Sequence, residues 1–70
     1  MFYVGQPIRT RFRGGNITAH IVRKSSIDHF VLKWELGKKS NAEKFNRLFS
    51  AKQLSNILSG KEELKEEKYE

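Results

Sequence analysis

Three arginines spaced two residues apart are the side chains of this sequence whose type and position point most directly to a chemistry. Arg9, Arg11 and Arg13 alternate with uncharged residues, and a period of two predicts a β-strand that presents all three guanidinium groups on one face. A guanidinium group is planar and binds a phosphate through two parallel hydrogen bonds, whereas an ammonium group acts as a point charge. The pattern therefore predicts a surface that contacts a polyanion.

Two predicted turns set the neighbours of these arginines, and the first is the glycine pair Gly14-Gly15. It supplies the positive φ that a two-residue hairpin turn needs, and it places Arg9 opposite His20 and Arg11 opposite Thr18. Like charges in such cross-strand rows cost stability. A surface selected only for solubility more often intersperses the two signs of charge, so the rows favour a binding surface.

A second turn, centred on Ser26-Ile27, extends the rows to a third strand. It places His20 opposite Lys33 and Val22 opposite Val31, so that a basic row lies beside a small apolar spot. Further basic residues occur in and after a long polar loop. We expect the following side chains to contact nucleic acid: Arg9, Arg11, Arg13, His20, Lys33, Lys38, Lys39 and Arg47.

Alternating apolar residues predict the strands that position this face. The expected strands are Ile8–Arg13, Ile17–Arg23, Phe30–Leu36 and Phe45–Phe49, with Phe2–Val4 as an additional short edge strand. A helix is expected next, because Ser50 and Gln53 have the spacing of a capping box and an apolar stripe of helical period follows them. Gly60 is a natural stop, so the helix is expected at residues 51–59.

The charge of the 70-residue chain is +6 and is unevenly distributed. Residues 1–60 hold eleven Lys or Arg against three Asp or Glu, and residues 61–70 hold three against five. We expect one domain over 1–60, followed by a charged, flexible tail over 61–70. A basic domain favours nucleic acid, an anionic membrane or an acidic protein as partner. The membrane is disfavoured because there is neither a basic amphipathic helix nor an apolar run of about 18 residues.

Catalysis, cofactor binding and metal binding are not expected from the residue types present. The chain has no cysteine and only two histidines, His20 and His29, which the predicted register separates. Ser25, Ser26 and Asp28 lie close to His29 in sequence, but serine and aspartate are also what turn chemistry favours. The start, MFYVGQ, lacks the basic and apolar regions of a signal peptide, so we expect a cytoplasmic protein.

The pattern resembles the small SH3-like barrels of the Tudor, chromo-barrel and KOW kinds. The resemblance covers about residues 3–58 and is carried by Val4-Gly5, Gly14-Gly15, Ala19 with Ile21-Val22, and Val31–Leu36. It implies a mainly β fold: a bent sheet or barrel of four to five short antiparallel strands with one short C-terminal helix. Size and basicity are also similar to those of the small basic chromatin proteins of archaea. The aromatic cage of methyl-lysine readers is not expected, because Ile17 follows the first turn and Lys38-Lys39 follow the third strand. Likeness of fold alone does not transfer function, so no binding residue is carried over.

These observations favour a non-enzymatic module that binds DNA or RNA through phosphate contacts, with low sequence specificity. The alternative is a protein–protein interaction module, an adaptor or an inhibitor of a nucleic-acid-processing enzyme, built on the same barrel. A component of a symmetric homo-oligomer is a third interpretation.

Overall fold

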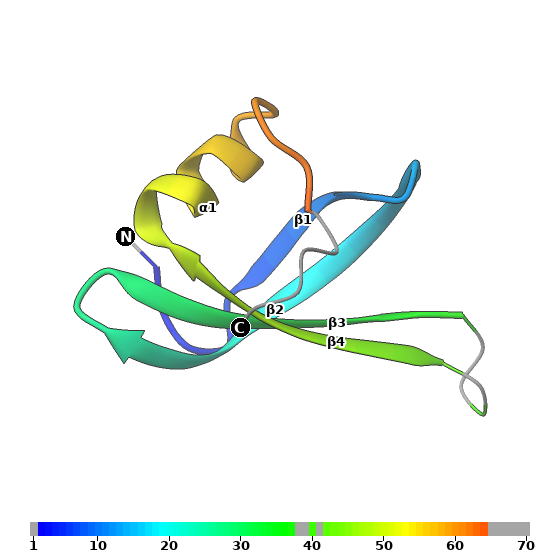
Figure 1. The fold of residues 1–70 in the computed structure, drawn as a ribbon, viewed down its shortest axis with the longest axis horizontal. Coiled ribbons are helices and arrows are strands. Elements are labelled where there is room, and N and C mark those ends of the chain that lie inside the picture. Colours follow the sequence, from blue (N-terminus) through cyan, green and yellow to red (C-terminus); the bar gives the residue numbers. More distant parts are fainter. Residues whose placement is uncertain (1, 38–39, 41, 65–70) are drawn as a thin grey trace.

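Four antiparallel strands form one bent and twisted sheet, and a single helix lies across one side of it (Figure 1). The structure is a computed structural model and describes residues 2–37, 40 and 42–64. The elements are β1 (Pro7–Phe12), β2 (Gly15–Ser26), β3 (His29–Leu36), β4 (Glu43–Ser50) and α1 (Ala51–Leu58). The strands pair in chain order, so β1 and β4 are the two edges. The predicted mainly β fold with four to five short strands and one terminal helix is confirmed.

The core lies between the helix and the inner face of the sheet, and the alternation in the sequence accounts for its members. Among its aromatic residues, the Phe12 ring lies edge-on to Trp34 and to Phe45, at centroid distances of 5.2 and 4.9 Å. Trp34 stacks on Phe45 at 5.3 Å. The buried apolar residues are Ile8, Phe12, Ala19, Ile21, Phe30, Leu32, Trp34, Phe45, Phe49, Leu54, Ile57 and Leu64. The described residues include no buried charged side chain.

The first hairpin turn is centred one residue earlier than predicted. Its central residues are Arg13 and Gly14, with φ of 53° and 78°, the positive values of a type I′ turn. Because moving a turn by one residue shifts the partner by two, Arg9 lies opposite Thr18, and the predicted pairing with His20 is wrong. A shift of two leaves every side chain on its predicted face.

The second hairpin contains a bulge that the sequence pattern did not indicate. His20 lies opposite Lys33 as predicted, but the register shifts after Ile21, and Arg23 rather than Val22 lies opposite Val31. A further shift precedes the turn, which therefore falls at Ile27-Asp28 and not at Ser26-Ile27. A β-bulge of this kind bends the strand and increases its twist, in keeping with the bent sheet of Figure 1.

The segment before β1 forms a turn and not the predicted strand Phe2–Val4. It is held to the bulged part of β2, where Gly5 N–H donates to the Ile21 carbonyl oxygen at 2.7 Å and Ile21 N–H donates to that of Gln6 at 3.1 Å. The Phe2 ring packs edge-on against Phe30 at 5.7 Å. This segment thus extends the pairing of β1 with β2 without adding a fifth strand.

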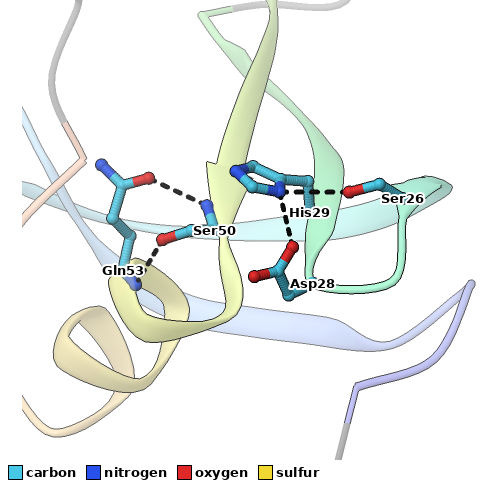
Figure 2. Close-up of polar contacts among 5 residues, drawn as sticks. All are labelled: Ser26, Asp28, His29, Ser50 and Gln53. Atoms are coloured by element: carbon cyan, nitrogen blue, oxygen red, sulfur yellow. Dashed lines mark hydrogen bonds and ion pairs between the residues drawn. The ribbon is translucent and has the colours of Figure 1, made fainter.

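Helix α1 begins with the predicted capping box. The Ser50 hydroxyl accepts from Gln53 N–H at 3.1 Å, and the Gln53 side-chain oxygen accepts from Ser50 N–H at 2.9 Å (Figure 2). The helix ends at Leu58, one residue before the predicted end, with Ser59 as its C-cap. It contacts both β1 and β4, and so lies over the open side of the bent sheet. Among the described residues, no helix has the length and apolar character to cross a membrane.

The chain after α1 returns to the sheet (Figure 1). Leu64 is only 4% exposed, and its N–H donates to the Arg11 carbonyl oxygen at 3.3 Å. The start of the predicted flexible tail, residues 61–64, therefore includes a core residue. The remainder of that tail, residues 65–70, lies outside the described residues.

Candidate nucleic-acid interface

The outer face of the sheet, which we define as the face turned away from α1, carries the basic side chains predicted to bind nucleic acid. On β1, Arg9 and Arg11 are exposed and alternate with Ile8, Thr10 and Phe12, which face inward. His20 on β2 lies directly opposite Lys33 on β3, and both are exposed. The structure therefore brings four of the eight predicted site residues onto one face.

Two further cations lie on this face although the prediction did not assign them to it. The bulge in β2 places Arg23 opposite Val31, whereas an unbroken alternation would have turned it inward. On β4, Lys44 lies opposite Glu35. The outward position of Lys44 follows from alternation in the sequence, because the neighbouring Phe45 faces inward. The outward position of Arg23 does not, because no sequence signal marks the bulge in β2.

The outer face is strongly basic and largely unneutralised. Within the described residues, Glu35 is the only carboxylate on it, against the cations Arg9, Arg11, Arg23, Lys33 and Lys44. None of these five cations has an ion pair within 4.0 Å of a described carboxylate. The potentials of these charges therefore add over the face and attract an anion.

Arg13 is held at the tip of the first hairpin and not on the outer face. Its guanidinium group pairs with Glu43 at 3.1 Å and lies over the rings of Phe12 and Phe45, 5.2 and 5.3 Å from their centroids. These contacts tie the hairpin tip to the start of β4. The positive charge is thus partly neutralised, although the side chain remains 37% exposed.

Arg47 lies on the core-facing side of β4, opposite Leu32. Its guanidinium carbon is 5.7 Å from the centre of the Phe45 ring, and Nη1 donates to the Asn46 carbonyl oxygen at 2.8 Å. The sequence already indicated this position, because Arg47 alternates with the apolar Phe45 and Phe49. Lys38 and Lys39, the remaining predicted residues, lie outside the described residues.

His29 forms a polar cluster at the second hairpin turn (Figure 2). Its Nδ1 is 2.8 Å from Asp28 Oδ1 and 3.1 Å from the Ser26 hydroxyl. In a nucleophilic triad the serine and the carboxylate contact different ring nitrogens, so that the imidazole can take the serine proton at one nitrogen while the carboxylate accepts from the N–H of the other. Here both contact the same nitrogen, which is the arrangement of a turn. The described residues contain no group of three or more His, Cys, Asp or Glu that could hold a metal ion.

A groove of about 760 Å³ lies beside the arginines, between the β1–β2 hairpin and the chain that follows α1. Arg9 and Arg11 line one side of it, and Glu62 and Glu63 line the other. Ile17, Ile57 and Leu58 line it as well. Arg9 and Arg11 lie on the edge strand β1, so they border this groove although alternation places their side chains on the outer face.

Comparison with known proteins adds no relative to this description: no family model, no curated protein and no solved structure matches the chain.

Proposed function

We propose that this protein is a non-enzymatic nucleic-acid-binding module that contacts phosphates through the outer face of its sheet. The observation that carries the proposal is the set of exposed cations on that face, which have no ion pair with a described carboxylate. Strands β1, β2, β3 and β4 all contribute to this set, through Arg9 and Arg11, Arg23, Lys33 and Lys44 respectively.

The arrangement suits a phosphate backbone because its cations are distributed over a surface and not gathered in a pocket. A nucleic acid carries a regular array of negative charges, and each phosphate that a Lys or Arg neutralises releases condensed counterions. Two of the cations, Arg9 and Arg11, are two residues apart on an edge strand, so each can reach a different phosphate. His20, beside Lys33, adds a further hydrogen-bond donor.

Low sequence specificity follows from the side chains that accompany the cations. Among the described residues, strands β1 to β4 contribute no exposed aromatic ring to the outer face, and their amides there are limited to Asn16 and Asn46; the exposed Tyr3 belongs to the turn before β1. Phosphate contacts position a protein on nucleic acid, whereas base specificity needs groups that reach the base edges. The protein is thus expected to bind many sequences with similar affinity.

The test is fluorescence anisotropy with labelled duplex DNA, single-stranded DNA and RNA of equal length, each over a series of salt concentrations. Five neutralised phosphates predict a slope of log K against log salt of about −4.5 on duplex DNA. Affinity should also change little between unrelated sequences. Absence of binding at low salt would contradict the proposal and turn attention to the alternative, a protein-interaction module.

A protein partner is less well supported by the edges of the sheet. Strand addition needs free backbone donors and acceptors along an edge strand. On β1 the Arg11 carbonyl oxygen accepts from Leu64, and on β4 the Asn46 carbonyl oxygen accepts from the Arg47 side chain. Both edges therefore have acceptors already in use.

A further inference from the structure

The groove beside β1 has both apolar side chains open to solvent and two arginines among its lining residues. Leu58, at the end of α1, is 47% exposed and lines the groove together with the half-buried Ile17. Ile57 is buried and forms part of its floor. An exposed leucine next to a half-buried isoleucine offers apolar surface that a flat ligand group can cover.

The charges around the groove are divided between its two sides. Arg9 and Arg11 are exposed and form no ion pair with a described carboxylate. On the opposite side Glu63 is exposed, while Glu62 accepts from the Asn56 side-chain amide at 2.8 Å. A ligand that is anionic at one end and offers hydrogen-bond donors at the other complements this division.

We propose that the groove holds one unpaired base of a single-stranded nucleic acid, with the adjoining phosphates on Arg9 and Arg11. This inference rests on the proposed function and specifies the form of nucleic acid. The face of a base is covered by its neighbours in a duplex, so only an unpaired base can place it against Ile17 and Leu58. The carboxylate of Glu63 repels phosphate and accepts from an exocyclic amino group, which orients the base toward that side.

The size of the groove agrees with this ligand. Sites that hold drug-sized molecules, a class that includes nucleosides, have volumes of roughly 300–1,000 Å³. The groove volume of about 760 Å³ falls within this range. Thr10, which lies opposite Ile17 on the inner face, lines the groove as well, and its hydroxyl group can donate to or accept from the base edge.

An extended peptide is the other ligand that could cover the apolar floor. The two unpaired arginines favour an anionic ligand over a neutral peptide, and the Arg11 carbonyl oxygen, one of the acceptors a peptide strand would use, accepts from Leu64 N–H. The nucleic acid is therefore the better-supported occupant.

The experiment compares Leu58→Ser with Ile27→Ser, a matched change at an 87% exposed residue in the second hairpin turn. Each variant is titrated against a labelled 12-nucleotide thymine strand, a 12-nucleotide cytosine strand and a 12-base-pair duplex. Circular dichroism checks the fold of both variants. The wild type should bind the single strands at least as tightly as the duplex, although the duplex has the higher charge density. Leu58→Ser should weaken single-strand binding about fivefold and leave duplex binding unchanged, and Ile27→Ser should change neither.

Amide chemical shifts of the wild-type protein give a second measurement that does not depend on a variant. Adding the single strand should shift Thr10, Ile17 and Leu58, whereas the duplex should shift residues of the outer face such as Lys33. If Leu58→Ser changed the affinities for single strand and duplex equally, or changed neither, the groove site would be overturned. Duplex binding that still weakened with salt would leave the proposed function standing. Absence of binding by all three nucleic acids would overturn both. Groove shifts with an acidic peptide of alternating Glu and Leu, but with no oligonucleotide, would overturn the inference in favour of a protein partner.

Discussion

The backbone N–H of Leu64 donates to the carbonyl oxygen of Arg11, 3.3 Å away, and the Leu64 side chain is buried. The contact joins a residue of the acidic C-terminal segment to the arginine strand. Leu64 belongs to the same buried core cluster as Leu54 and Ile57 of α1. Two consequences follow, one for stability and one for the charges near the arginines.

Replacing Leu64 with alanine is expected to destabilise the fold by about 2–4 kcal/mol, because it removes a buried leucine and leaves a cavity. The matched control is Leu58→Ala, which truncates a half-exposed leucine of the same region and should cost less than half as much. Urea denaturation followed by Trp34 fluorescence measures both. Equal and small losses would show that residue 64 is not part of the core.

Removing the charge of Glu63 should tighten binding to duplex DNA. The carboxylate lies across the groove from Arg9 and Arg11 and lowers the positive potential there. Glu63→Gln keeps the shape and is expected to raise affinity about two- to threefold at low salt, with a smaller gain at high salt. Deleting residues 61–70 would be a poorer test, because it also removes Leu64 from the core.

The control for Glu63→Gln is Asp28→Asn, which changes the net charge equally but lies at the second hairpin turn. Anisotropy titrations of the two variants separate a local effect from an effect of overall charge. Equal gains would indicate that only the net charge matters.

Replacing both Arg9 and Arg11 with alanine should weaken binding to every nucleic acid tested and reduce the duplex salt slope by about two. The physical reason is the loss of two phosphate contacts on the edge strand. The double variant Lys52→Ala, Lys61→Ala loses the same charge from exposed residues of α1 and the chain after it. The duplex salt slope of this control should change by less than one. A change as large as that of the arginine variant would argue against the outer face as the binding surface.

Arg23 and Lys24 are neighbours on opposite sides of β2, and the bulge decides that Arg23 is the one that faces outward. Arg23 lies opposite Val31 on the outer face, whereas Lys24 lies opposite Phe30, with Nζ 6.0 Å from the centre of that ring. Arg23→Ala should therefore weaken duplex binding and reduce the salt slope by about one, and Lys24→Ala should have the smaller effect. The same titrations measure both. An equal or larger effect of Lys24→Ala would contradict the assignment of Arg23 to the binding face.

The inner face of the sheet and the start of the helix could be predicted from the sequence because both depend on local patterns. Alternation identified residues such as Ile8, Leu32 and Trp34 as core, and a shift of two in the first hairpin left that assignment intact. The spacing of Ser50 and Gln53 predicted the capping box, whose two hydrogen bonds join residues three apart.

The tertiary structure decided the features that depend on contacts between distant residues. From the local sequence alone, either Gly14-Gly15 or Arg13-Gly14 can form the two central residues of the hairpin turn. In the folded hairpin Arg13 lies over Phe45 and pairs with Glu43, contacts that only the folded sheet provides. The bulge that brings Arg23 to the outer face has no local signal. Leu64 likewise follows a run of charged residues, and its burial depends on the space between β1 and α1.

The sequence by itself thus determined which side chains face inward and that a basic sheet face exists, because alternation and charge are properties of neighbouring residues. Only the tertiary structure decided which further cations join that face. Turn position, bulge and the return of the chain after α1 are set by the packing of aromatic and aliphatic side chains far apart in the sequence. Arg9, Arg11, His20 and Lys33 are on the face by alternation; Arg23 is there because the folded sheet bends.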